Sequence, residues 1–210
     1  MSPHRIFLLS PADCGGTRAQ MVLRPGATFE LARRVQARSG APLGEIFSFM
    51  SGLYFRGKLA YARHFSRSDR LPKPLVITPG HGLLPWDTRV GLAELEAYGS
   101  VPVDLADARY AQSLCRSAEA LAGATKAEAV LLGSVATGKY VDCLLPAFGE
   151  RLLFPAEFVG RGDMSRGGLM LRCVAQDEEL TYITVAGAVR KGSRPARLPK
   201  PEPLKTPRPR

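Results

Sequence analysis

Short apolar runs alternate along the chain with longer amphipathic stretches. The runs are bounded by polar or turn-forming residues, which is typical of strands that are buried on both faces of a sheet. They cover residues 5–9, 74–78, 128–132, 151–154 and 180–185. We therefore predict strands at these positions.

The stretches between the runs carry apolar residues at three- and four-residue spacing, which predicts helices. In residues 43–65 this apolar stripe is interrupted by Gly52 and Gly57, so the segment forms either one long helix or two. Residues 157–168 are predicted to form a polar loop, and residues 169–175 a helix. The other predicted helices cover about residues 28–38, with Thr28 as N-cap, 92–98, 108–122 and 137–148.

This alternation of strands and helices predicts an α/β fold, specifically a Rossmann-like, mainly parallel sheet with helices on both faces. Right-handed crossovers place the loops that follow parallel strands at one edge of the sheet. Ligands of open α/β sheets bind at that edge. We therefore expect the functional site in the loops after the strands.

The chain has 210 residues and a formal charge of +10, which is unevenly distributed. Residues 1–192 have the length and balance of one domain, whereas residues 193–210 hold six Lys or Arg, one acid and six Pro. Such a segment cannot form a core and is predicted to be a disordered, extended basic tail. It serves either for electrostatic attachment to nucleic acid or another polyanion, or as a solubilising terminus without a specific partner.

The spacing of the cysteines and the length of the apolar runs indicate the cellular compartment in which the protein is expected. Cys14, Cys115, Cys143 and Cys173 are far apart and form no CxxC pair, which argues against a zinc ribbon and against a disulfide framework. We therefore expect a reducing environment, no metal, and most of the cysteines as small buried residues. No run approaches the about 20 apolar residues that a membrane span requires. A cytoplasmic protein without membrane contact is expected, and the cofactor and oligomeric state are left open.

One glycine-rich segment, residues 133–140, follows a predicted strand and opens a predicted helix. Its G-x4-G-K spacing approaches that of a phosphate-binding P-loop, but Tyr140 stands where a magnesium-binding hydroxyl is needed. ATP hydrolysis is therefore not expected. The helix N-terminus and Lys139 remain candidates for holding an anion, and the alternative is a structural turn capped by Thr137.

Two further loops that follow strands carry candidate chemistry. After the first strand, Ser10 is followed by Asp13, and Gly15 and Gly16 allow a ligand to approach the backbone closely. Asp13 is a candidate base, whereas Cys14 is better explained as an inert residue in a tight turn.

In residues 160–168, glycines surround Arg161, Asp163 and Arg166. Arginine offers a planar fork for phosphate or base edges. His81 lies in the loop after the second strand, which is a better position for function than that of His64 on a helix.

Together these loops resemble the YaaA-like superfamily, whose bacterial members are linked to peroxide stress. The resemblance spans roughly residues 5 to 175 and rests on the order of short motifs as well as on their type. The matching segments are Ser10-Pro11-Ala12, residues 52–57, Ile77-Thr78 through Gly82-Leu83-Leu84-Pro85 to Asp87, Ser134 to Tyr140 with Pro146 ending its helix, and residues 161–166. The resemblance implies an α/β fold, association with DNA and protection of DNA under oxidative stress. Related domains are similar to partners of 7-deazaguanine nucleic-acid modification.

Three hypotheses follow. In the first, the protein is associated with nucleic acid and binds a phosphate, nucleotide or base in a pocket at the strand ends. Its ligand-binding residues are then Ser10, Gly15, Gly16, Thr137, Lys139, Tyr140, Arg161 and Arg166. In the second, it is an enzyme acting on a nucleotide or nucleobase, with Asp13, His81 and Asp163 as catalytic candidates. In the third, it is a basic interaction module without pocket chemistry.

Overall fold

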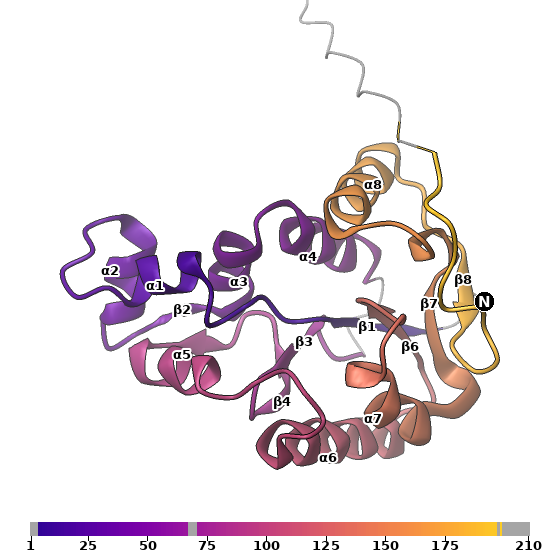
Figure 1. Cartoon of the computed structure of the whole chain (residues 1–210), viewed down its shortest axis with the longest axis horizontal. Coiled ribbons are helices and arrows are strands. Elements are labelled where there is room, and N and C mark those ends of the chain that lie inside the picture. Colours follow the sequence, from indigo (N-terminus) through magenta and orange to yellow (C-terminus); the bar gives the residue numbers. More distant parts are fainter. Residues whose placement is uncertain (1–3, 67–70, 197, 199–210) are drawn as a thin grey trace, which may run out of the picture.

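A six-stranded sheet forms the centre of the molecule (Figure 1). The computed structural model describes residues 4–66, 71–196 and 198. The strand order is β4-β3-β1-β6-β7-β8, in which the four inner strands are parallel and β4 and β8 are antiparallel edge strands. The strands are β1 (Arg5–Leu9), β3 (Leu75–Thr78), β4 (Gly82–Pro85), β6 (Glu128–Leu132), β7 (Leu152–Pro155) and β8 (Tyr182–Thr184). The prediction of a mainly parallel α/β sheet is confirmed.

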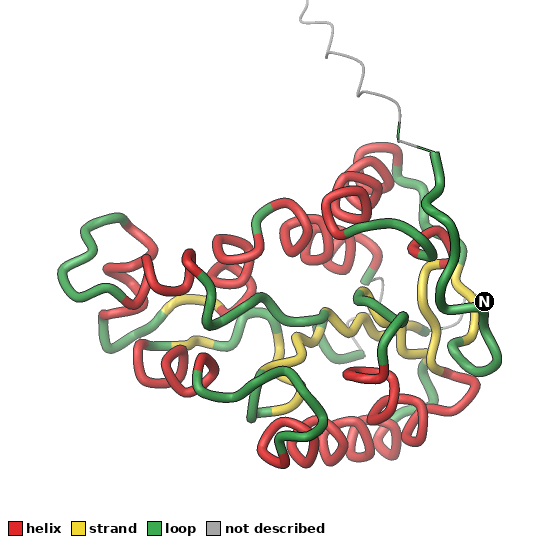
Figure 2. Tube along the Cα trace, in the orientation of Figure 1, coloured by secondary structure: helices red, strands yellow, loops and turns green. Residues whose placement is uncertain are grey.

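Helices cover both faces of this sheet (Figure 2). One layer contains α1 (Thr17–Leu23), α2 (Glu30–Gln36), α3 (Leu43–Ser51), α4 (Leu53–Phe65) and α8 (Asp163–Gln176). The opposite layer contains α6 (Ala108–Ala124) and α7 (Gly138–Phe148). The remaining elements are α5 (Leu92–Gly99), which contacts α1, a small ribbon of β2 (Ala41–Pro42) and β5 (Arg89–Val90), and 3-10 turns at Gly149–Arg151 and Ala156–Phe158.

The central strands are apolar over most of their length because each face of the sheet is covered, and the exceptions Arg5, Thr78 and Glu128 lie at strand ends. In β1, Phe7 and Leu9 face the layer of α4 and α8, whereas Ile6 and Leu8 face α6 and α7. All four side chains are buried. The continuous apolar runs of the sequence thus correspond to strands that are buried on both sides.

Helices α4 and α8 cross at two glycines. A Cβ atom on Gly57 would lie 2.6 Å from the carbonyl oxygen of Gly167, and a Cβ atom on Gly167 would lie 2.7 Å from that of Leu53. Only residues without a side chain permit this approach of two backbones. The crossing brings the first turns of both helices together above the strand ends.

The segment 43–65 forms two helices, and the break lies at Gly52. Gly52 has φ +61°, a left-handed value that favours glycine, and it ends α3 and precedes α4. Of the two alternatives that the apolar stripe left open, the structure therefore selects the second.

Several predictions of local structure are wrong. The loop predicted over residues 157–168 ends at Gly162, because α8 begins at Asp163, so Asp163 and Arg166 are helical. Pro146 lies inside α7 rather than at its end. The cap of α2 is Phe29 and not Thr28. Helix α1 and the hairpin of β3 and β4 were not predicted, since both are short and lack a distinctive apolar period.

The cysteines also differ from expectation. Cys115 on α6 and Cys143 on α7 form a disulfide, whereas Cys14 and Cys173 are free and buried. The two partners lie 28 residues apart in sequence, and the packing of α6 against α7 brings them together. Wide spacing in the sequence therefore did not exclude a disulfide.

Thiol titration in denaturant should find two reactive thiols before reduction and four after it. Reduction should lower the free energy of unfolding by about 3 kcal/mol, because the bond closes a loop that limits the unfolded chain. The double variant Cys115→Ser/Cys143→Ser is the control and should not respond to reductant. Four thiols before reduction would contradict the pairing.

The first residues of the predicted basic tail lie against the body. A Cβ atom on Gly160 would meet the carbonyl oxygen of Ser193 at 2.0 Å, and Arg161 Nη1 donates to the carbonyl oxygen of Ala196 at 3.4 Å. The rest of the predicted tail, residue 197 and residues 199–210, lies outside the described residues. Among the helices that the structure describes, none combines the length and apolar character needed to cross a membrane.

Candidate functional site

The connections between parallel strands reverse direction at β1 and β6. From β1 the chain passes to β3 on one side, and from β3 it returns across β1 to β6 on the other. The loops after β1 and β6 therefore diverge, and a crevice opens between them. Such switch points are where open α/β sheets bind ligands.

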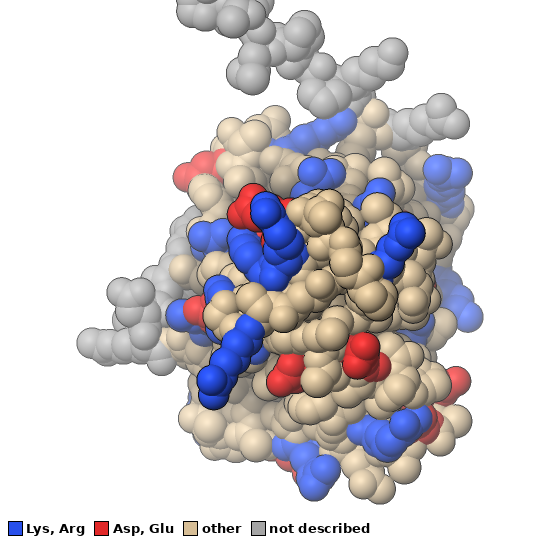
Figure 3. Space-filling view, turned by 90° about the vertical axis from the view of Figure 1, so that its left-hand side faces the viewer, with Lys and Arg blue, Asp and Glu red and all other residues tan. Residues whose placement is uncertain are grey.

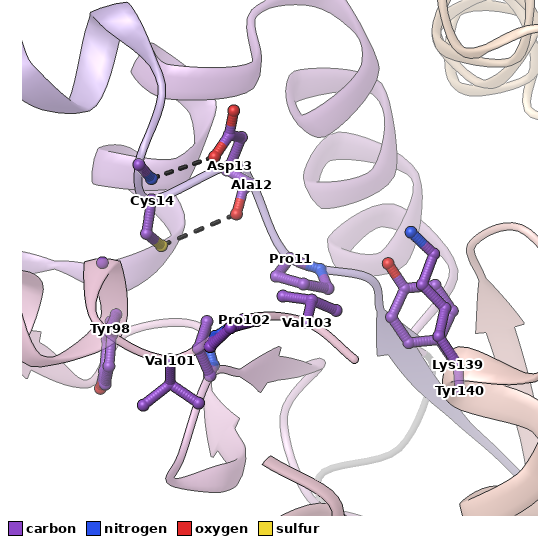
Figure 4. Close-up of a pocket in the computed structure, with 13 residues that line it drawn as sticks. Pro11, Ala12, Asp13, Cys14, Tyr98, Val101, Pro102, Val103, Lys139 and Tyr140 are labelled. Carbon is purple, nitrogen blue, oxygen red and sulfur yellow. Dashed lines mark hydrogen bonds between the residues drawn. The ribbon is translucent and has the colours of Figure 1, made fainter. Parts of the chain in front are cut away.

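A cavity of about 390 Å³ lies at this crevice, and we call it the switch cavity. In Figure 4, Asp13 and Cys14 lie on one side of it, Tyr98 and Val101 lie below them, and Lys139 and Tyr140 lie across from them. The lining residues come from the loops after β1 and β3, from the segment after α5, and from the start of α7. They are Pro11, Ala12, Asp13, Cys14, Gly15, Pro79, Tyr98, Gly99, Val101, Pro102, Val103, Lys139 and Tyr140.

The β1 loop is held by its own hydrogen bonds. The backbone N–H of Gly15 donates to Asp13 Oδ1 at 3.0 Å, which makes a local turn. The thiol of Cys14 lies 3.6 Å from the carbonyl oxygen of Ala12, and burial together with the Asp13 carboxylate raises its pKa to about 12. Cys14 therefore stays protonated at neutral pH and is not a nucleophile, in agreement with its interpretation as an inert turn residue.

Helix α7 presents Lys139 and Tyr140 to the cavity in different ways. The Lys139 side chain is exposed, whereas the Tyr140 ring is buried and burial raises the pKa of its hydroxyl. A Cβ atom on Gly138 would meet the Asp142 carboxylate at 2.1 Å, so an acidic side chain already lies at this helix N-terminus. This arrangement differs from a P-loop, in which the phosphate takes that position.

Behind the cavity lies a group of polar side chains, which we call the strand-end cluster: the buried Ser10, Tyr54, Lys58, Tyr140 and Arg166, and the exposed Asp163 at its rim. Its centre is Lys58 on α4, which is 0% exposed. Lys58 Nζ donates to the carbonyl oxygen of Ser10 at 2.6 Å and to Ser10 Oγ at 2.8 Å. The amine also lies over the rings of Tyr54 and Phe55, at 4.3 and 4.7 Å from their centroids.

No ion pair compensates the Lys58 amine among the described residues. Burial is the main cause that lowers the Lys58 pKa to about 7. The positive charge of Arg166 also lowers this pKa, whereas the Asp163 carboxylate raises it. A buried lysine without a paired carboxylate is costly to keep charged. At neutral pH a substantial fraction of this amine is therefore uncharged.

The two tyrosines of the cluster are neutral donors. Burial raises the pKa of Tyr54 to about 12, and Ser10 and Arg166 lie near enough to oppose that rise. Nevertheless the buried Tyr54 hydroxyl makes no hydrogen bond of good geometry. A buried hydroxyl without a well-aligned partner is costly, so the Tyr54 hydroxyl is available to donate to a further group.

Helix α8 supplies the charges at the rim of the cluster. Arg166 is 8% exposed and donates from Nε and Nη2 to the carbonyl oxygen of Phe158, at 3.3 and 3.0 Å. Its Nη1 lies 3.6 Å from Asp163 Oδ1. The Asp163 side chain is 66% exposed, so the acid remains open to solvent while the arginine is fixed by the backbone.

The structure brings together only part of the residues selected from the sequence. Asp13, Gly15, Lys139 and Tyr140 line the switch cavity, and Tyr140 links it to the strand-end cluster with Ser10, Asp163 and Arg166. The remaining candidate residues do not line the switch cavity.

Thr137 lines a separate hollow with Arg190 and Lys191, and Arg161 lines another with Arg172 and Arg194. His81 is exposed and does not line the cavity, although its ring lies 5.2 Å from that of Tyr98. Gly16 lies against the Asp13 carboxylate but also does not line the cavity. No group of three His, Cys, Asp or Glu side chains in the described residues is arranged to hold a metal ion.

Sequence reasoning missed Lys58 and Tyr54. Both belong to the buried stripe of α4, whose members recur at spacings of four, three and four residues: Tyr54, Lys58, Tyr61 and Phe65. A lysine at a stripe position is the signal that could have identified the cluster, because lysine is almost never fully buried without a reason.

Comparisons of the chain with protein-family models, with curated proteins and with solved structures found no match.

Proposed function

We propose that this protein associates with nucleic acid and binds a phosphate, nucleotide or base in the switch cavity. The observation that carries the proposal is the position of the cavity. It lies at the reversal between β1 and β6 and is lined by Lys139 and by the rings of Tyr98 and Tyr140. Aromatic rings suit a base, and cationic side chains suit a phosphate.

The distribution of charge supports a polyanionic partner. Residues 17–65, which form α1 to α4, hold eight Lys or Arg and two Asp or Glu, a formal charge of +6. The end of the molecule formed by α1 and α2 carries more basic than acidic side chains on its surface (Figure 3). Exposed arginines there include Arg18, Arg24, Arg33 and Arg38. Such a surface attracts nucleic acid without regard to sequence.

Titration calorimetry with nucleoside mono- and diphosphates, inorganic phosphate and short oligonucleotides tests the proposal. Lys139→Ala should weaken binding about 10-fold or more, because it removes a charge-assisted hydrogen bond from the cavity wall. Lys126→Ala is the matched control, since exposed Lys126 precedes β6 at the opposite edge of the sheet. Its affinity should remain that of the parent chain.

Two results would count against the proposal. One is the absence of binding by any of these compounds. The other is equal weakening by Lys139→Ala and Lys126→Ala, which would mean that net charge rather than the cavity determines affinity.

A further inference from the structure

We propose that Ser10 and Lys58 form a nucleophile and general-base pair, which gives this protein an acyl-transfer activity on activated carboxylic esters. The inference does not depend on the nucleotide proposal, because it rests on the strand-end cluster and not on the cation at the cavity wall.

The geometry of the pair supports this role. Lys58 Nζ lies 2.8 Å from Ser10 Oγ and donates to the Ser10 carbonyl oxygen at 2.6 Å. One N–H of the amine is thereby directed to a fixed acceptor, so the lone pair of the neutral amine is free to accept the hydroxyl proton of Ser10. The Ser10 backbone is itself anchored, because its N–H donates to the carbonyl oxygen of Leu132 at 3.2 Å. Nucleophile and base are therefore positioned before any substrate arrives.

The surroundings keep the amine available as a base. The groups that face it are Tyr54 on its own helix, Ser10 in the loop after β1, and Asp163 and Arg166 on α8, while Tyr140 of α7 lies near Ser10. The one carboxylate among them, Asp163, forms no ion pair with Lys58, and the Lys58 pKa of about 7 matches the range in which a general base works best. An ordinary lysine would be protonated at this pH and unable to accept a proton.

The cluster also offers a donor for the charge that develops on the substrate. The Tyr54 hydroxyl is buried, stays protonated and makes no hydrogen bond of good geometry within the described residues. A hydroxyl of this kind can donate to an oxyanion that forms next to Ser10, as in other acyl-transfer sites. Ser10 is 4% exposed and does not itself line the switch cavity, but its neighbour Pro11 does, together with Tyr140, so the proposed reaction requires a substrate to reach Ser10 from that cavity.

The reaction balances without a cofactor. Ser10 Oγ attacks the carbonyl carbon of an ester, a C–O bond forms, and the hydroxyl proton passes to Lys58 Nζ. The tetrahedral intermediate collapses, the ester C–O bond breaks, and the leaving alcohol takes the proton from the Lys58 ammonium. Water then hydrolyses the seryl ester by the same two steps, which releases the acid and restores Ser10.

Labelling of the folded full-length chain with a small fluorophosphonate tests the inference without a known substrate. Ser10 Oγ should displace fluoride from phosphorus, and peptide mass spectrometry should locate the label at residue 10. The labelling rate of the parent chain should rise with pH and level off above a midpoint near pH 7, as Lys58 loses its proton.

Variants separate the chemistry from the fold. Ser10→Ala should abolish the label, and Lys58→Met should slow it by roughly 100-fold or more. Ser134→Ala removes a hydroxyl from the neighbouring β6 loop and should label like the parent chain. Each variant is first checked for folding by its unfolding transition, and if Lys58→Met does not fold, the pH profile of the parent chain decides.

The proposal is overturned by an unlabelled Ser10 in the folded chain, by labelling that Lys58→Met leaves unchanged, or by a rate without a midpoint near pH 7. A nucleotide that binds to a chain with unreactive Ser10 would leave the proposed binding function standing. A labelled Ser10 in a chain that binds no nucleotide would support the proposed reaction and contradict the proposed binding function.

Discussion

Replacing Gly57 by alanine should lower the free energy of unfolding by about 3 kcal/mol, near the upper end for overpacking substitutions. The new Cβ atom would lie 2.6 Å from the carbonyl oxygen and 2.9 Å from the Cα atom of Gly167. Both are backbone atoms, so no side chain can rotate away, and α4 and α8 must separate. Urea unfolding of the parent chain and the variant measures the effect.

Gly123→Ala is the matched control, because Gly123 lies in the last turn of α6 and a Cβ atom there would meet nothing within 4 Å. This variant should be more stable than the parent chain by about 0.5–1 kcal/mol, since alanine is the better helix former. If Gly57→Ala and Gly123→Ala changed stability equally, the close crossing of α4 and α8 would be refuted.

Replacing Lys58 by methionine should change how stability depends on pH. In the unfolded chain the amine is hydrated with a pKa near 10.5, whereas burial lowers the folded pKa to about 7. Between these values the unfolded chain binds one more proton, so the stability of the parent chain rises with pH by about 1.4 kcal/mol per pH unit. The penalty is complete below about pH 7 and is relieved as pH rises.

The measurement is the difference in free energy of unfolding between Lys58→Met and the parent chain, from pH 6 to pH 9. It should be constant below about pH 7 and then fall by about 1.4 kcal/mol per pH unit in favour of the parent chain. Its size at one pH is less informative, because methionine also removes the donor to the Ser10 carbonyl oxygen. Lys126→Met, with an exposed side chain, should show a difference that does not change with pH. Parallel curves for Lys58→Met would contradict the buried amine.

The sequence by itself determined the class of fold and most of the elements. The apolar runs of β1, β3, β6 and β7 are buried on both faces, and a strand in that environment is apolar at every position whatever its neighbours are. The expectation that loops after these strands meet at one edge rests on topology, because parallel strands with helical crossovers leave their carboxyl ends at one edge. Asp13, Lys139 and Tyr140 thus line one cavity although about 125 residues separate them.

Only the tertiary structure decided which side chains meet. Lys58 and Tyr54 were hidden in an apolar stripe, and Lys58 reaches Ser10 because α4 packs against β1. Two glycines let α4 and α8 cross at backbone contact, which brings Asp163 and Arg166 near the same amine. Cys115 and Cys143 pair for a comparable reason, since α6 and α7 pack side by side on the other face of the sheet. Arg161 and Arg166 are five residues apart, yet one lines a hollow near the chain end and the other is buried beneath the strand ends. A local pattern specifies the face that a residue occupies on its own element, whereas contacts between elements depend on helix crossings and backbone separations, which involve residues far apart in the chain.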